Sequence, residues 1–203
     1  MSLYTDASLI MFPSGYKEDK IYSLKPTDGS GDLTFTRAST ATRVNAEGLI
    51  ETSPVNLASY SEQFDNAYWA KYSCTITANT TETTAPNGTN SADIFVSANA
   101  TASSGIEGNI AYINGGQYTV SIFAKYKNTA FIQMLAPSFV TADFVNFNIQ
   151  TGAIVGGSYS QTPTITSVGN GWYRCSFTYV SNYTGTTAIS PIFLIDSASA
   201  TRG

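Results

Sequence analysis

Apolar and polar residues alternate with a period of two in several short stretches of the second half of the chain. Such a period puts successive side chains on opposite faces of a β-strand. The clearest stretch covers residues 117–126, and its core-facing set is predicted to be Tyr118, Val120, Ile122, Ala124 and Tyr126. Residues 172–180 predict a second strand, with Tyr173, Cys175, Phe177 and Tyr179 on one face.

Tight-turn residues join these strands into hairpins. Thr151-Gly152 separates predicted strands at 145–149 and 153–155, and Gly169-Asn170-Gly171 separates 164–168 from 172–180. Further strands are predicted at 72–79, 91–97, 131–136 and 188–195. Only residues 61–70 hint at a helix. Short strands with intervening turns and no βαβ pattern predict an all-β fold, an antiparallel sandwich or barrel.

The composition of the chain changes near residue 56. Residues 1–56 hold 12 of the 24 charged residues, contain the turn-rich stretch 28–32, and show only short strand-like pieces at 20–24, 33–36 and 49–51. Such a segment buries little apolar area alone, which predicts an extended N-terminal arm that gains order by docking. The alternative is that it wraps back onto its own domain. Residues 57–203 carry the predicted sandwich.

Charge and composition exclude several classes of function. The net charge is -4 with only 10 Lys and Arg, a poor basis for binding nucleic acid. No run has the length of a membrane span, and the first residues do not form a signal peptide. The absence of histidine removes the commonest general base, and no catalytic motif is present, so we expect no enzyme. An enzyme, for example a depolymerase, would need two carboxylates facing each other across a groove.

No cofactor is expected. Cys74 and Cys175 cannot form a zinc site alone and are interpreted as small buried hydrophobes, with a disulfide as the alternative. A structural calcium ion could use Asp93 or Asp196 with backbone carbonyls, but no acidic cluster supports it.

Aromatic residues in predicted loops suggest a second type of function. Sugar rings stack on exposed aromatic side chains, and Tyr112, Tyr159 and Tyr183 are the candidate glycan contacts. The alternative for each is core packing, which we also predict for Trp172 at the start of its strand.

Two resemblances add to this picture. The first resemblance is to the start of virion appendage proteins of tailed bacteriophages, including crAss-like and other Bacteroidetes-infecting phages. It is carried by residues 31–45 (GDLTFTRASTATRVN), 48–51 (GLIE), 9–17 (LIMFPSGYK) and 20–23 (KIYS). The second resemblance is to the carbohydrate-binding-module-like jelly roll of phage fibres. It is carried by residues 56–57, 61–69 (SEQFDNAYW), 85–89, 118–125 and 170–175 (NGWYRC).

The resemblances imply a non-enzymatic head- or tail-fibre subunit located in the virion. Residues 1–56 would form the attachment arm, and residues 57–203 a projecting jelly-roll sandwich. The implied partners are capsid, neck or tail proteins, further copies of the chain in a homo-oligomer with a trimer favoured, and host-surface glycan, which is the alternative principal role. The implied attachment residues are Leu9, Ile10, Phe12, Tyr16 and Tyr22.

The chain departs from the second resemblance at its end. Members usually carry another strand with an aromatic-Gly-Ala-Gln-like run after residues 188–195, whereas this sequence ends at Ala200-Thr201-Arg202-Gly203. The expectation is a short version, a fragment, or a sandwich completed by a neighbouring chain through its open sheet edge.

Overall fold

The computed structural model divides the chain into two compact units, Met1–Asn56 and Leu57–Gly203. The boundary lies where the composition changes. The structure describes residues 7–17, 20–28, 30–34, 42–44, 47–52, 55–98, 104–137, 141–188, 192–198 and 201–202. In these ranges all regular elements are strands, and every pairing is antiparallel.

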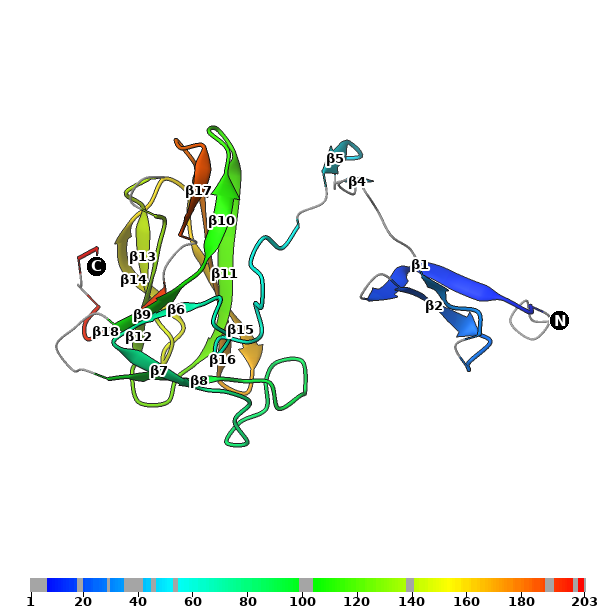
Figure 1. Ribbon diagram of the computed structural model, residues 1–203, viewed down its shortest axis with the longest axis horizontal. Coiled ribbons are helices and arrows are strands. Elements are labelled where there is room, and N and C mark those ends of the chain that lie inside the picture. Colours follow the sequence, from blue (N-terminus) through cyan, green and yellow to red (C-terminus); the bar gives the residue numbers. More distant parts are fainter. Residues whose placement is uncertain are drawn as a thin grey trace. The chain divides into compact units, whose positions relative to one another are not determined.

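One layer of the larger unit is a six-stranded sheet, with the order β14-β13-β12-β18-β9-β6 (Figure 1). Its strands are β6 (Ala70–Tyr72), β9 (Ser104–Glu107), β12 (Phe131–Leu135), β13 (Phe144–Asn148), β14 (Ala153–Ser158) and β18 (Ile192–Ile195). The remaining strands are β7 (Cys74–Thr77) paired with β8 (Ile94–Ser97), β10 (Asn109–Tyr112) paired with β17 (Gly185–Ala188), and β11 (Gln117–Lys125), β16 (Trp172–Val180) and β15 (Thr164–Gly169) in a three-stranded sheet.

The core forms between the six-stranded sheet and these other strands. Met134 and Phe147 of the six-stranded sheet belong to one buried cluster with Cys175 and Phe177 of β16. The apolar side chains of β11 pack against the same cluster. This arrangement is an all-β antiparallel sandwich, as predicted; its jelly-roll connectivity stays a prediction.

The predicted alternation is confirmed on the two longest strands. Tyr118, Val120, Ile122 and Ala124 of β11 pack on the core, as do Tyr173, Cys175, Phe177 and Tyr179 of β16. Tyr126 is the exception. It lies beyond the end of β11 and is 38% exposed, because no opposing strand continues there.

Both predicted hairpins are present, β13–β14 and β15–β16. The second turn suits its residues, because Gly169, Asn170 and Gly171 all have positive φ (92°, 52° and 78°). Positive φ is strained for most residues but accessible to Gly and Asn.

Several element predictions were wrong in detail. The predicted strand 72–79 is split at Ser73, whose φ is 46°. The predicted strand 188–195 is divided between β17 and β18, which pair with the unpredicted strands β10 and β9. Residues 61–70 form no helix. Three successive backbone hydrogen bonds instead close turns, from the N–H groups of Gln63, Asn66 and Trp69 to the carbonyls three residues earlier.

The smaller unit contains short sheets. The strands β1 (Ile10–Lys17), β2 (Lys20–Lys25) and β3 (Leu33–Thr34) form one sheet, and β4 (Thr42–Val44) and β5 (Ile50–Thr52) form a separate pair. The pieces predicted at 20–24, 33–36 and 49–51 correspond to β2, β3 and β5, although residues 35–36 lie outside the described ranges. Pro13-Ser14-Gly15 lies inside β1, where the pairing register with β2 is irregular.

Candidate functional site

Tyr112 is not a surface residue, which corrects its assignment as a glycan contact. Only 1% of it is exposed, and its hydroxyl lies 3.0 Å from that of Tyr179 in the core. Burial, reinforced by Tyr179, raises the pKa of Tyr112 well above its ordinary value. The residue belongs to β10, a strand that the sequence pattern did not predict. The sequence pattern predicts a loop at this position, whereas the structure has a strand.

The other two candidate tyrosines lie in different segments. Tyr159 follows β14 and is 42% exposed, so its ring is available to solvent. Tyr183 lies between β16 and β17, is half-buried and packs against the core. Among the described residues, no hydrogen bond or ring contact joins these two tyrosines.

The predicted attachment residues lie at the β1–β2 pair. Ile10, Phe12 and Tyr16 are on β1, Tyr22 is on β2, and Leu9, directly before β1, is 53% exposed. Other large apolar residues of the smaller unit are also exposed, namely Leu24, Leu33, Val44, Leu49 and Ile50. Each of these apolar side chains in the described part of the smaller unit is therefore in contact with solvent.

Asp93, one of the two acidic residues considered for calcium, is engaged by backbone N–H groups. Both carboxylate oxygens of Asp93 accept backbone N–H groups, from Phe64 at 3.0 Å and from Asn79 at 2.9 Å. Asp196 is exposed. Within the described ranges, no group of three or more His, Cys, Asp or Glu side chains is arranged to hold a metal ion.

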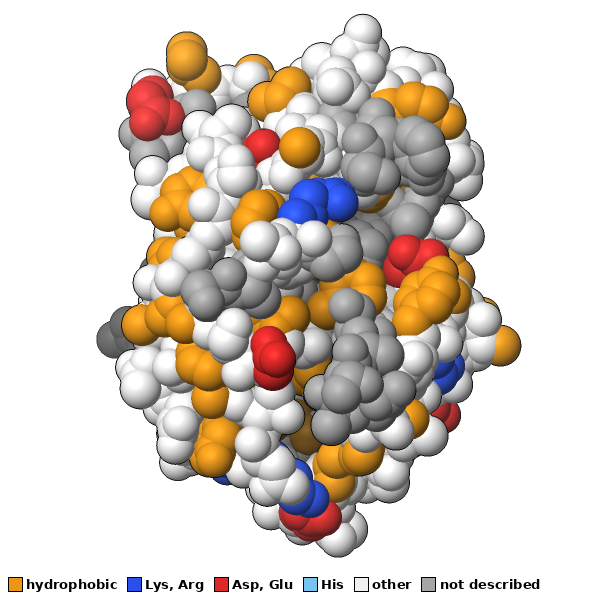
Figure 2. Space-filling model, turned by 90° about the vertical axis from the view of Figure 1, so that its left-hand side faces the viewer, with side chains coloured by type: hydrophobic (Ala, Val, Ile, Leu, Met, Phe, Trp, Pro, Cys, Tyr) orange, Lys and Arg blue, Asp and Glu red, His pale blue; other side chains and the backbone are white. Residues whose placement is uncertain are grey.

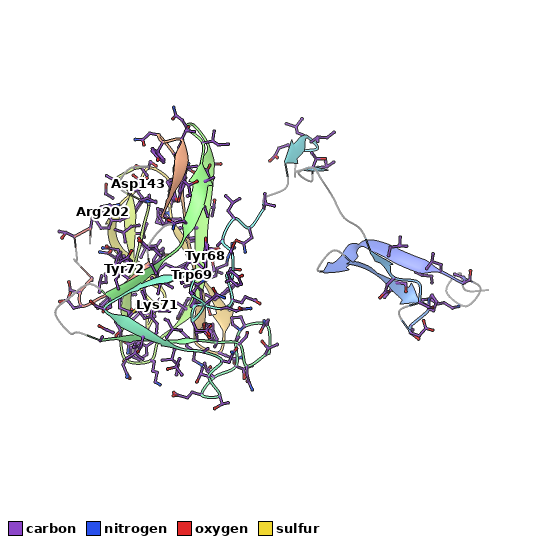
Figure 3. All side chains as sticks on the ribbon, in the orientation of Figure 1. Tyr68, Trp69, Lys71, Tyr72, Asp143 and Arg202 are labelled. Carbon is purple, nitrogen blue, oxygen red and sulfur yellow. The ribbon has the colours of Figure 1, made fainter. Side chains whose placement is uncertain are left out.

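A lysine ammonium occupies a cluster of carbonyl oxygens near the start of the sandwich (Figure 3). The Nζ of Lys71 donates to the carbonyls of Asp65 at 3.1 Å, Asn66 at 3.0 Å and Trp69 at 3.1 Å. The cation thereby fixes the turns that precede β6. Trp69 is buried beside it, and its ring meets that of Tyr68 edge-on at 5.1 Å.

The two cysteines are free thiols. The Sγ of Cys74 lies 3.2 Å from the carbonyl of Gly105, and the residue is half-buried. Cys175 is completely buried, which raises the pKa of its thiol to about 12. The interpretation of Cys175 as a small buried hydrophobe is confirmed.

The outer face of β11, β16 and β15 carries an aromatic ring, a guanidinium and several hydroxyl groups. On β11 the side chains of Thr119, Ser121 and Phe123 point away from the core and are exposed. Phe123 lies opposite Arg174 of β16, which in turn lies opposite Thr166 of β15. We call the area around this row the Phe123 platform; it comprises Phe123, Arg174, Thr166, Ser121, Ser176 and Thr164.

A loop closes one end of the platform. In the row beyond Phe123, Trp172 lies opposite Lys125. The Nε1 of Trp172 donates to the carbonyl of Thr84 at 2.9 Å, and the Nζ of Lys125 donates to Oγ1 of Thr83 at 2.9 Å. Trp172 is therefore buried, as predicted, but under this loop on the outer side of the sheet.

The platform carries positive charge and hydroxyl groups. The Nη2 of Arg174 donates to Oγ of Ser121 at 3.3 Å. The nearby loop carries Glu82, which forms its ion pair with Lys127 at 2.6 Å. In the described part of the chain, no carboxylate pairs with Arg174.

Sequence reasoning missed Phe123 as a site residue. It occupies the polar phase of the alternation in β11, which places its ring on the outward face of the sheet, and this position was the available signal. On another face of the molecule, shown in Figure 2, charged side chains are few and scattered between polar and apolar ones.

The chain matches no family model and none of the curated proteins with which it was compared. Among the described residues, no helix is long and apolar enough to cross a membrane.

Proposed function

We propose that this protein is a non-enzymatic structural protein of a tailed-bacteriophage virion, a subunit of a head or tail fibre. Its smaller unit attaches the subunit to capsid, neck or tail proteins, and its β-sandwich projects from the particle. The segments that resemble phage appendage proteins support this proposal, as does the division of the chain at residue 56.

The observation that carries the proposal is the exposed apolar surface of the smaller unit. In the β4–β5 pair, Val44 lies opposite Ile50, and these residues are 66% and 78% exposed. Leu49, which directly precedes Ile50, is 65% exposed. An isolated pair of three-residue strands is at best marginally stable in water. Burial of these side chains against a partner would supply the missing stabilisation.

The same surface is suited to assembly with further copies of the chain. A fibre brings several copies side by side, and a trimer is the arrangement that we propose. Short strands with free edges can also pair with strands of a capsid, neck or tail protein.

The test uses the full chain in a phage that encodes it. The double variant V44S/I50S should lower incorporation into purified particles at least about tenfold, because binding energy concentrates in buried apolar anchors. The matched control is V96S/V180S, which replaces two exposed valines of the larger unit, each 46% exposed.

Incorporation is measured by immunoblotting particles against their capsid protein. Immunogold labelling with antibodies to residues 57–203 shows which end of the particle carries the protein. Unlabelled wild-type particles overturn the virion assignment, and normal incorporation of V44S/I50S overturns the role given to the β4–β5 pair.

A further inference from the structure

Phe123 presents an aromatic ring to solvent from the middle of a regular sheet. It is 48% exposed, although its strand neighbours Ile122 and Ala124 pack against the core. Unlike an aromatic residue at a mobile chain end, it projects from a nine-residue strand paired along its whole length with β16. A ring held in this way forms a preorganised apolar stacking surface.

The polar groups around the ring are donors or hydroxyls. Arg174 is directly opposite Phe123, and the next row along the sheet consists of Ser121, Ser176 and Thr164. One row further, the hydroxyls of Thr119 and Thr178 lie 2.8 Å apart. Successive outward-facing rows are about 7 Å apart along a strand, so a flat ligand could contact the ring, the guanidinium and the hydroxyls together.

We propose that the Phe123 platform binds an acidic polysaccharide, a chain of sugar rings that carry carboxylates. The apolar C–H face of a sugar ring would stack on Phe123. The guanidinium of Arg174 would hold a carboxylate through charge-assisted hydrogen bonds, and the hydroxyl rows would bond to sugar hydroxyls. The proposal rests on the proposed function in that it names what the projecting sandwich contacts.

The charge of the platform favours an acidic polysaccharide over a nucleic acid or a neutral polysaccharide. The whole chain is acidic, with a net charge of -4, yet the outward-facing residues of the platform include a cation and no acid. A nucleic acid would need many phosphate contacts, whereas Arg174 is the platform's single cation. A carboxylated polysaccharide needs one such group per acidic sugar.

The loop that contains Thr83 and Thr84 indicates in which direction a bound polysaccharide would extend. It covers Trp172 and engages Lys125 in the row next to Phe123, so it forms a raised edge at that end. The opposite end, toward Thr119 and Thr178, continues as open sheet. A polysaccharide would therefore extend from Phe123 along β11 and β16, away from the loop.

Affinity gel electrophoresis of the purified full chain tests the proposal. The gels contain polygalacturonate, alginate or hyaluronan as acidic probes, and dextran or xylan as neutral ones. The variants are F123S and R174Q, both at exposed positions, and the matched control is V96S on β8, where Val96 is 46% exposed.

We expect at least one acidic polysaccharide to retard the wild-type protein and V96S equally. F123S and R174Q should weaken that binding at least about tenfold, because each removes a central contact. Added salt should weaken binding of the wild-type protein more than that of R174Q, because R174Q has lost the charge.

Three results would overturn the proposal: no retardation by any acidic probe, equal retardation by neutral probes, or binding unchanged in both variants. The virion assignment is tested by a different experiment, because it depends on incorporation of the protein into particles. F123S and R174Q should enter particles normally, and saccharide binding is measured without particles.

Discussion

Lys71 shows how a single residue can organise a stretch without regular secondary structure. Its ammonium donates to three backbone carbonyls, those of Asp65, Asn66 and Trp69. These carbonyls belong to the turns that replace the expected helix. The bonds to Asn66 and Trp69 are partly buried, and a carbonyl that loses a hydrogen bond away from water costs free energy.

Replacing Lys71 with methionine should therefore destabilise the sandwich by about 1–3 kcal/mol, because the methionine fills similar volume but donates no hydrogen bond. The measurement is urea unfolding followed by tryptophan fluorescence. Lys127→Met is the control, since its ion pair with Glu82 is exposed and should contribute less than about 1 kcal/mol. Equal stabilities of the two variants would contradict the role given to Lys71.

Burial of the Cys175 thiol predicts a loss of stability at high pH. Its pKa is raised from the ordinary 9.0 to about 12 in the folded protein. Above pH 9 the unfolded thiol loses its proton while the folded one keeps it, so stability is full below pH 9 and falls as pH rises toward 12. The raised pKa of Tyr112 acts in the same direction at higher pH.

The measurement is the urea midpoint at intervals between pH 7 and pH 11. Cys175→Ala should show a shallower decline above pH 9 than the wild-type protein. Parallel declines in the two proteins would show that this thiol does not contribute.

At the scale of elements, close contacts between strands decide where glycine is required. Gly105 on β9 lies opposite Phe193 on β18, whose ring covers the space above it. A Cβ at residue 105 would lie 2.3 Å from the Phe193 ring and 3.0 Å from the carbonyl of Ile192. The absence of a side chain at residue 105 therefore leaves room for this ring.

Gly105→Ala should destabilise the protein by about 1–3 kcal/mol, because the ring and the β18 backbone must move apart. Urea unfolding checks this value, with Thr75→Ala on the exposed side of β7 as the control. A Gly105→Ala protein as stable as the control would show that Phe193 turns aside without cost.

At the scale of the whole molecule, the two units should unfold independently. Every member of the buried core cluster lies in residues 57–203. Both tryptophans, Trp69 and Trp172, are also in this unit, so their fluorescence reports on the sandwich alone. The chain comprising residues 57–203 should therefore match the full chain in unfolding free energy within about 0.5 kcal/mol.

A lower free energy of unfolding for residues 57–203 would contradict this prediction. It would favour the alternative in which the N-terminal segment wraps back onto its own domain. The fluorescence measurement thus separates the two interpretations of residues 1–56.

Local sequence patterns were sufficient to predict the strand-rich fold, both hairpins and the core-facing sides of β11 and β16. These features depend on local patterns: a period of two, or a turn that only certain residues enter easily. Glycine and asparagine at 169–171 already specify the turn between β15 and β16. The change in composition at residue 56 is similarly a property of the chain itself.

Which side chains reach solvent depends instead on how the elements pack together. Alternation gives the face of a strand but not what covers that face, which depends on segments distant in sequence. Trp172 is buried by a loop nearly 90 residues earlier, whereas Phe123, one row away, stays exposed. Tyr112 is buried because β10 and β16 bring it beside Tyr179. The candidate site therefore followed from packing between elements, which no local pattern contains.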